Sequence, residues 1–216
     1  TSLAVAELTV GLLLALAREI PRADSAMKQG KWLKKELEGV ELNGKTLGVV
    51  GFGRIGMEVG KRAAAFGMNV IAYDPLISAD DIKKRGAEPA SLQDLYAWSD
   101  FISLHMPLTV DTRDMVGRQA FSQMKDGVRI VCAARGGIID ETALVEALNG
   151  GKVAGAALDV FSVEPPGLAE AVSHPRVIAT PHVGAQTAEA QSRASEDIAH
   201  EVLSALRGES LRWKVA

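Results

Sequence analysis

The sequence predicts an α/β fold in which helices cover both faces of a doubly wound, parallel β-sheet. Six short apolar runs alternate with helical segments, which is typical of strands that are buried on both faces of a parallel sheet. The chain has 216 residues and 47% hydrophobic content, which is enough to bury a complete core. The third observation is a group of glycines between the first apolar run and the helix that follows, where a nucleotide-binding sheet needs a tight turn.

The first predicted element is a helix over residues 1–21, ended by Pro21. It is apolar on nearly every side, which predicts burial in a core or an interface. Its uninterrupted apolar part, "VGLLLALA", is too short to span a membrane. Next, "KQGKWLKKELEG" over residues 28–39 is predicted as a helical link with solvated lysines. Because the chain starts with threonine inside the first helix, we interpret it as a piece of a longer protein.

The elements of the sheet follow in regular alternation. Short runs of apolar and β-branched residues predict strands at residues 45–51, 68–74, 100–106, 128–134, 153–161 and 177–182. Helical segments are predicted between them at residues 54–66, 91–97, 117–124 and 140–148, and a last helix at 187–207 follows the final strand. This alternation places helices on both sides of a parallel sheet.

The glycines of "LGVVGFGRIGMEVG" stand after a strand and at the start of a helix. In a nucleotide-binding turn, Gly51 permits the sharp bend, Gly53 lets a pyrophosphate approach bare backbone, and Gly56 allows the helix to lie close to the strand. The amides of Arg54 and Ile55 would then face the phosphates. The alternative is an ordinary tight turn between a strand and a helix.

An acidic residue follows the second predicted strand. Asp74 lies 18 residues after Gly56, about where this kind of fold places the carboxylate that binds the ribose. A carboxylate accepts hydrogen bonds from ribose hydroxyls and repels a 2′-phosphate, which favours NAD over NADP. The alternative role for Asp74 is that of a turn residue before Pro75.

Polar residues also follow the later strands, at the sheet edge where ligands of open α/β sheets bind. Arg135 comes after a strand and before two glycines, and its guanidinium suits a carboxylate. His182 lies just after the last strand, Asp159 at a strand end, and Glu164 in a loop bounded by prolines. A histidine, a glutamate and an arginine at one edge suit the oxidation of a hydroxy acid, although each could also have a structural role.

Six segments resemble, in order, the signatures of the D-isomer-specific 2-hydroxyacid dehydrogenase family: "VAELTVGLLLALAREIP", "GKTLGVVGFGRIG", "SLHMPLT", "ARGGIIDETAL", "AGAALDVFSVEPP" and "TPHVGAQTAEAQ". The resemblance implies a Rossmann-type NAD-binding domain over residues 1–208. It also implies that residues 209–216 are a tail leading toward a substrate domain that this chain lacks. The implied activity is hydride transfer between NAD and a D-2-hydroxy acid, and we expect this chain alone to be inactive.

The resemblance also implies roles for individual residues. Arg135 anchors the substrate, Glu164 supports the histidine, and His182 is the acid/base, while Asp159 holds the nicotinamide carboxamide. The other cofactor contacts that the resemblance implies are Met106, Ala133, Ala134, Arg135, His182, Val183, Gly184 and Ala185. Two residues depart from the family pattern, since Cys132 stands where asparagine is frequent and Met106 where threonine is frequent.

The remaining expectations concern partners and setting. A net charge of −3 argues against a surface built for nucleic acid or an anionic membrane. The one cysteine cannot form an intrachain disulfide, no metal site is indicated, and a cytoplasmic setting is expected. The resemblance implies a homodimer that uses the first helix and the arm after it, with apolar residues 12–16 at the interface. The competing function class is an NAD-sensing binding module similar to the corepressors of this fold.

Overall fold

The computed structural model describes residues 1–211 and contains a seven-stranded sheet in the order β3-β2-β1-β4-β5-β6-β7, in which every pair of neighbours is parallel. The strands are β1 (Thr46–Val50), β2 (Asn69–Tyr73), β3 (Glu88–Pro89), β4 (Phe101–Leu104), β5 (Val128–Cys132), β6 (Val153–Leu158) and β7 (Val177–Ala179). The helices are α1 (Ser2–Arg18), α2 (Ile20–Lys28), α3 (Arg54–Ala65), α4 (Ala79–Lys84), α5 (Leu92–Trp98), α6 (Arg118–Gln123), α7 (Glu141–Asn149), α8 (Glu170–Ser173) and α9 (Ala188–Leu206). The predicted fold class is confirmed.

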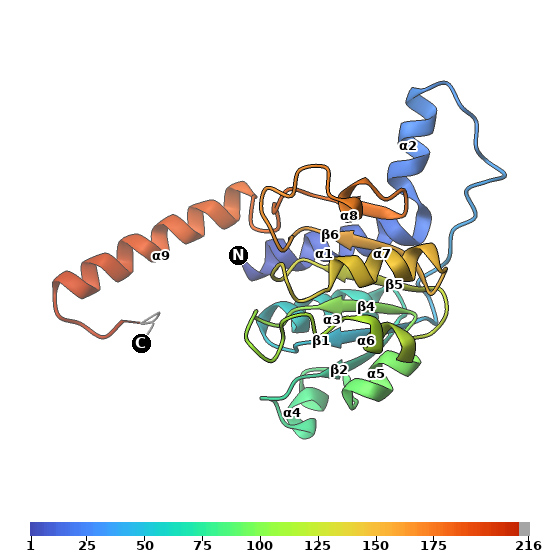
Figure 1. Ribbon diagram of the computed structural model, residues 1–216. Coiled ribbons are helices and arrows are strands. Elements are labelled where there is room, and N and C mark those ends of the chain that lie inside the picture. Colours follow the sequence, from blue (N-terminus) through green and yellow to red (C-terminus); the bar gives the residue numbers. More distant parts are fainter. Residues whose placement is uncertain (212–216) are drawn as a thin grey trace.

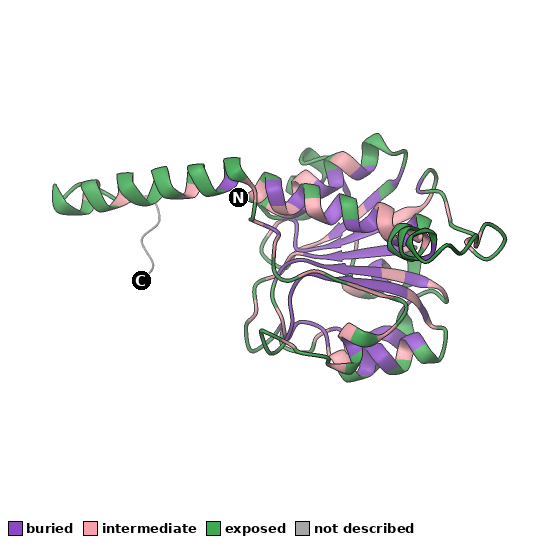
Figure 2. Cartoon of the chain, turned by 90° about the horizontal axis from the view of Figure 1, so that it is seen from above, coloured by how far each residue is buried: buried purple, intermediate pink, exposed green. Residues whose placement is uncertain are grey.

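Alternate residues of the strands face two separate hydrophobic clusters, one on each side of the sheet. On β4, Ile102 and Leu104 join the cluster that contains residues of α5, α6 and α7, whereas Phe101 joins the cluster that contains residues of α1, α3 and α4. This alternation follows from the strand period of two residues. Figure 2 shows buried residues along the strands and on the inward sides of the helices. The sheet is therefore the middle layer of three.

The order of the strands fixes where the site lies. The chain proceeds outward from β1 through β2 to β3, and then returns to the other side of β1 with β4. In open α/β sheets, ligands bind at the carboxyl ends of the strands where the strand order reverses, and here the reversal lies between β1 and β4. The predicted site residues follow the carboxyl ends of β1, β2, β4, β5, β6 and β7, so all belong to one edge of the sheet.

The amino-terminal region differs from its prediction. The first helix ends at Arg18, because Glu19 adopts a left-handed conformation with φ of 51°, and Pro21 lies in the first turn of α2. A proline is well accommodated there, since the first turn has no backbone acceptor for its missing N–H. The predicted helix over residues 28–39 is wrong beyond Lys28, because residues 31–44 form turns and irregular structure. This arm projects from the body together with α2 (Figure 1).

The apolar residues 12–16 of α1 do not form an exposed patch. Leu12, Leu13 and Leu16 have exposed fractions of 5%, 1% and 7%, and they belong to the cluster on the α1 side of the sheet. The helix packs against α3, β5 and β6, so this domain's own core buries the leucines. The expected dimer contact of this stretch is therefore not supported.

Other differences concern short elements and the last helix. The sequence patterns did not predict α4, β3 or α8, which have six, two and four residues, too few for a periodic signal. Strand β6 stops at Leu158, before the predicted end at residue 161. Helix α9 is confirmed within one residue of its predicted bounds, and it extends away from the body (Figure 1). Of the predicted tail at 209–216, residues 212–216 lie outside the described residues.

Candidate active site

The turn between β1 and α3 has the geometry of a phosphate-binding turn. Gly51 has φ of 92°, and a side chain there would begin 2.8 Å from the carbonyl carbon of His105. A Cβ on Gly56 would lie 2.1 Å from the carbonyl oxygen of Gly51, whereas one on Gly53 would meet nothing within 4 Å. Glycine is thus required at 51 and 56 by crowding within the protein, while Gly53 borders open space. That open side is where a ligand phosphate could approach the backbone.

Asp74 ties the end of β2 to this turn. Its Oδ2 accepts the N–H of Phe52 at 2.8 Å, and its Oδ1 accepts the N–H of Leu76 at 2.9 Å. The second hydrogen bond closes a local turn, which is the alternative role that the sequence predicted for Asp74. Each carboxylate oxygen keeps a further acceptor position, so ribose binding by Asp74 is compatible with this geometry and stays a prediction.

His182 and Glu164 contact each other at the same edge of the sheet, beyond the carboxyl ends of β7 and β6. The Nδ1 atom of His182 lies 2.8 Å from Oε2 of Glu164, and the other carboxylate oxygen accepts the N–H of Phe161 at 3.0 Å. His182 has a left-handed φ of 53°. Its contact with Glu164 places the proton on Nδ1 and leaves Nε2 for a substrate. The hydrogen bond from His182 lowers the pKa of Glu164, as do the N–H of Phe161 and the charge of Arg135.

The loop that carries Arg135 lies against the loop that leads to Glu164. A Cβ on Gly136 would lie 1.8 Å from the carbonyl oxygen of Phe161, so only glycine lets the loop after β5 lie against the loop after β6. The Arg135 side chain is in an exposed position, and its Nη1 donates to the carbonyl of Ala134 at 2.6 Å. Its charge acts on Glu164. The structure thus brings together the three residues that the sequence placed in separate loops.

Asp159 organises the loop that carries His182. Its side chain is buried, with 1% of the residue exposed. Oδ1 accepts the hydroxyl of Thr180 at 2.6 Å and the N–H of Val183 at 2.9 Å, and Oδ2 accepts the N–H of Gly184 at 2.9 Å. The Asp159 carboxylate therefore accepts hydrogen bonds from three donors of the protein itself. Its contact with a nicotinamide carboxamide stays a prediction.

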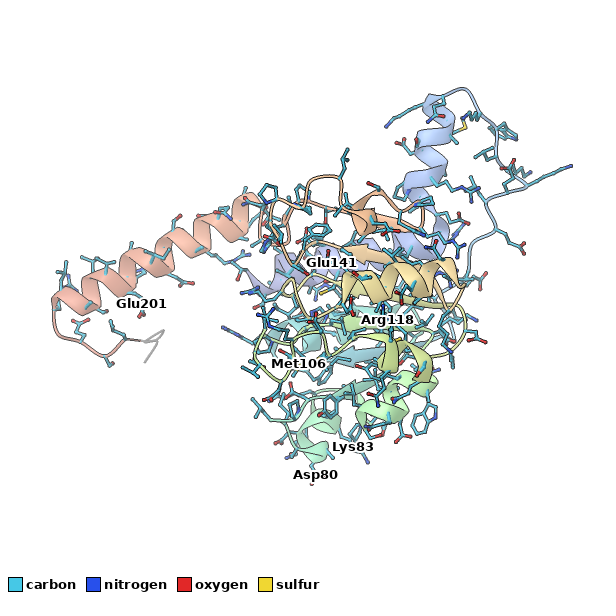
Figure 3. The ribbon with its side chains drawn as sticks, in the orientation of Figure 1. Asp80, Lys83, Met106, Arg118, Glu141 and Glu201 are labelled. Carbon is cyan, nitrogen blue, oxygen red and sulfur yellow. The ribbon has the colours of Figure 1, made fainter. Side chains whose placement is uncertain are left out.

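The sequence analysis missed a supporting residue, Glu141. Its Oε1 accepts both the N–H and the hydroxyl of Ser162 at 2.7 Å, which holds the loop between Phe161 and Glu164 in place. Figure 3 shows Glu141 at the start of α7, with Met106 lower on the same side. The signal in the sequence was an acidic residue in the first turn of a helix. Because such residues also stabilise the helix dipole, this signal did not by itself indicate a role at the site.

Three side chains near the edge are poor candidates for proton transfer. Burial raises the pKa of the Cys132 thiol to about 11 and lowers the pKa of His105 to about 4. Both are uncharged at neutral pH, and Nε2 of His105 lies 2.7 Å from the hydroxyl of Ser103. Met106 packs against the hydrophobic core as a partly buried residue. These residues shape the site rather than react in it.

The other predicted cofactor contacts surround the same edge. Ala133 and Ala134 are buried after β5, with exposed fractions of 7% and 8%. Val183, Gly184 and Ala185 follow His182, and all three are at least partly buried. Within residues 1–211, no group of three or more histidine, cysteine, aspartate or glutamate side chains could hold a metal ion. No helix of that part of the chain is both long and apolar enough to cross a bilayer.

A family model described as the NAD binding domain of D-isomer specific 2-hydroxyacid dehydrogenases matches residues 10–184. The chain belongs to this family. The match confirms the family resemblance seen in the sequence motifs, and it identifies NAD as the cofactor of the matched domain. The open turn at Gly53 and the amides at the start of α3 fit a dinucleotide, because they offer donors to its phosphates.

Individual relatives within the dehydrogenase family are similar over nearly the whole chain. The D-3-phosphoglycerate dehydrogenase of Rattus norvegicus is 50% identical over 210 residues, which are 97% of this chain and 39% of that protein. The hydroxypyruvate reductase of Thermotoga maritima is 53% identical over 205 residues, 94% of this chain and 66% of that protein. The chain spans about two fifths of the length of the phosphoglycerate dehydrogenases that it matches.

A solved structure shows the same fold. The D-lactate dehydrogenase of Aquifex aeolicus, solved in complex with NAD and lactic acid, superposes with a TM-score of 0.88 and is 35% identical. The alignment covers 97% of this chain and 68% of that one. The remaining part of that enzyme has no counterpart here, which agrees with the expectation that most of a substrate domain is absent from this chain.

Proposed function

We propose that this chain is the cofactor domain of an NAD-dependent dehydrogenase that oxidises a D-2-hydroxy acid, namely 3-phosphoglycerate, to 3-phosphohydroxypyruvate for serine biosynthesis. The observation that carries the proposal is the contact of 2.8 Å between His182 and Glu164, with Arg135 close enough to act on the same carboxylate. The choice of substrate is supported by the 50% identity to phosphoglycerate dehydrogenases. A reductase of hydroxypyruvate or glyoxylate is the second candidate, favoured by the 53% identity to the Thermotoga protein.

The proposed mechanism assigns one task to each side chain. Arg135 binds the substrate carboxylate, which holds C2 and its hydroxyl beside His182. Nε2 of His182 takes the hydroxyl proton as the alcohol becomes a ketone. Glu164 accepts a hydrogen bond from the Nδ1 N–H of His182 throughout and stabilises the imidazolium that forms. Bound NAD would supply the acceptor for the hydride of C2.

The proposed cofactor contacts follow the sheet edge from β1 to β7. The amides of Gly53, Arg54 and Ile55 face the pyrophosphate, and Asp74 accepts the ribose hydroxyls. The residues proposed near the nicotinamide are Met106, Ala133, Ala134, Asp159, Val183, Gly184 and Ala185. Asp159 has a second task in this proposal, because its bonds to Val183 and Gly184 position the loop of His182.

We place the homodimer contact on α2 and the arm after it, instead of on residues 12–16. Ile20, Met27 and Trp32 have exposed fractions of 52%, 55% and 76%, so apolar surface is present where α2 and the arm leave the body. Light scattering of the 216-residue chain measures the outcome. A dimer that Trp32→Ser weakens is expected, and a monomer at micromolar concentration would contradict the assignment.

Calorimetry with the 216-residue chain tests the cofactor site. The parent should bind NAD and discriminate against NADP, because Asp74 repels a 2′-phosphate. Asp74→Ala should weaken NAD binding by about 1.5–3 kcal/mol, the value of one hydrogen bond to a charged group. The same substitution should weaken NADP binding by less. Equal binding of NAD and NADP by the parent would refute the role of Asp74.

The chemical step is tested in the full-length protein against a panel of 2-hydroxy and 2-oxo acids. 3-Phosphoglycerate should be the best substrate, and preference for glyoxylate or hydroxypyruvate would favour the second candidate. His182→Asn should lower turnover by about 10²–10⁴ and leave NAD affinity unchanged. Near-normal turnover of that variant would remove His182 from the mechanism.

A further inference from the structure

A side chain that directly follows α4 reaches the phosphate-binding turn. Arg85 lies just after α4, in an exposed position, and its Nη1 donates to the carbonyl oxygen of Phe52 at 3.0 Å. The two residues are 33 positions apart in the sequence. The neighbouring cation behaves differently, since Lys84 pairs with Asp81 of its own helix at 3.2 Å. Arg85 is therefore directed at the turn and away from the usual local partners of a surface cation.

Phe52 is held at both of its backbone groups. Its N–H donates to Oδ2 of Asp74 at 2.8 Å, and its carbonyl accepts from Arg85. Gly51 before it also has an occupied N–H, which donates to the carbonyl of Tyr73 at 2.8 Å. The N–H of Gly53, in contrast, has no acceptor within residues 1–211. Gly53 is thus the first amide of the turn that remains for a ligand.

The peptide between Phe52 and Gly53 connects Arg85 to that amide. It is a trans peptide, in which the carbonyl and the N–H point in opposite directions within one plane. Because the Phe52 carbonyl points toward Arg85, the N–H of Gly53 points away from Arg85, on the opposite side of the peptide. Glycines on both sides of Phe52 give this peptide unusual rotational freedom, so a fixed orientation needs an outside contact.

We propose that Arg85 is a positioning residue for the cofactor phosphates: it holds the Phe52 carbonyl outward, so that the Gly53 N–H faces the pyrophosphate. Rotation of the peptide would turn a carbonyl oxygen toward the anionic phosphates in place of a donor, which weakens binding. The inference rests on the NAD site of the proposed function. It adds a residue outside the glycine motif that determines cofactor affinity.

Calorimetry and competition binding test this role with three variants of the 216-residue chain. Arg85→Met keeps the length of the side chain but removes its donors, and Arg85→Lys keeps one donor group. Lys83→Met is the matched control, because it also removes one positive charge, two residues away on α4, where Lys83 is exposed at the edge of the molecule (Figure 3). The probes are NAD, ADP-ribose and adenosine, of which adenosine carries no phosphate.

Arg85→Met should weaken binding of NAD and ADP-ribose by about 3- to 10-fold, the usual effect of one hydrogen bond, and leave adenosine binding unchanged. Arg85→Lys should restore most of the loss, and Lys83→Met should bind as the parent does. Parent-like affinity of Arg85→Met for ADP-ribose would overturn the inference, and so would an equal loss in Lys83→Met or an equal loss for adenosine. If the parent itself failed to bind NAD, the proposed function would fall together with the inference.

Discussion

Asp159→Asn is the substitution whose cost the structure defines most closely. The carboxylate accepts three hydrogen bonds, from the hydroxyl of Thr180 and the N–H groups of Val183 and Gly184. An asparagine amide has one acceptor atom and one donor group. Whichever way the amide is turned, its NH₂ group faces at least one backbone N–H. The variant therefore leaves one buried backbone donor without an acceptor.

A lost bond of this kind, with a buried donor left unsatisfied, costs about 1–3 kcal/mol. For a chain of 150–250 residues, about 2–4 °C of melting temperature corresponds to each kcal/mol. Asp159→Asn should thus lower the melting temperature by roughly 2–12 °C, which differential scanning fluorimetry measures and urea denaturation checks independently.

The matched control is Asp126→Asn. Asp126 is 90% exposed and forms an ion pair with Lys152 at 2.8 Å. An exposed pair of this kind contributes about 0–1 kcal/mol, so the control should melt within about 4 °C of the parent. If Asp159→Asn melted no lower than this control, the three hydrogen bonds would not stabilise the loop of His182, and the reasoning would be refuted.

Three further outcomes are expected of the 216-residue chain. Gly136→Ala should lose at least the 1–3 kcal/mol typical of overpacking in urea denaturation, because its Cβ would lie 1.8 Å from the carbonyl oxygen of Phe161; an unchanged midpoint would contradict the loop contact. Because the pKa of Glu164 is lowered by folding, its carboxylate stabilises the fold above the ordinary value of 4.5, and this contribution disappears as the pH falls through the lower folded-state pKa. Glu164→Gln should therefore be less stable than the parent near neutral pH, by at most about 1 kcal/mol since the pair is partly exposed, and the two should converge below pH 4.5; a pH-independent difference would argue against the hydrogen bond between the Glu164 carboxylate and His182. Cys132 is 2% exposed, with a pKa raised to about 11, so a disulfide reagent at neutral pH should modify it only after denaturation, and rapid modification of the folded chain would contradict its burial.

Local patterns in the sequence were sufficient for the elements that depend on neighbouring residues. The apolar runs predicted six of the strands, because burial on both faces of a parallel sheet leaves a continuous apolar signal. The turn at Gly51 and the acid at Asp74 were predicted for a similar reason, since strand, turn and helix follow one another within the chain. The family motifs then indicated the cofactor, and the family match confirmed it.

Sequence patterns failed where the outcome depended on which surface a segment meets. An apolar helix suits a core and an interface equally well, and only its packing on α3, β5 and β6 shows that Leu12, Leu13 and Leu16 lie in the core of this domain. The lysine-rich segment after α2 has good helix formers, but intrinsic propensity is a weak signal that tertiary context overrides.

For the candidate site as well, the sequence determined one part and the tertiary structure the other. The sequence by itself determined the residue types at the sheet edge, because Arg135, Glu164 and His182 each follow a recognisable strand. Only the tertiary structure decided how they are arranged: His182 contacts Glu164, the contact of Gly136 with Phe161 brings the loop of Arg135 against the loop before Glu164, and the buried carboxylate of Asp159 holds the loop of His182. The physical reason is that these contacts join residues about 25 positions apart. Their energy depends on distances of a few tenths of an ångström, which no local pattern of residues records.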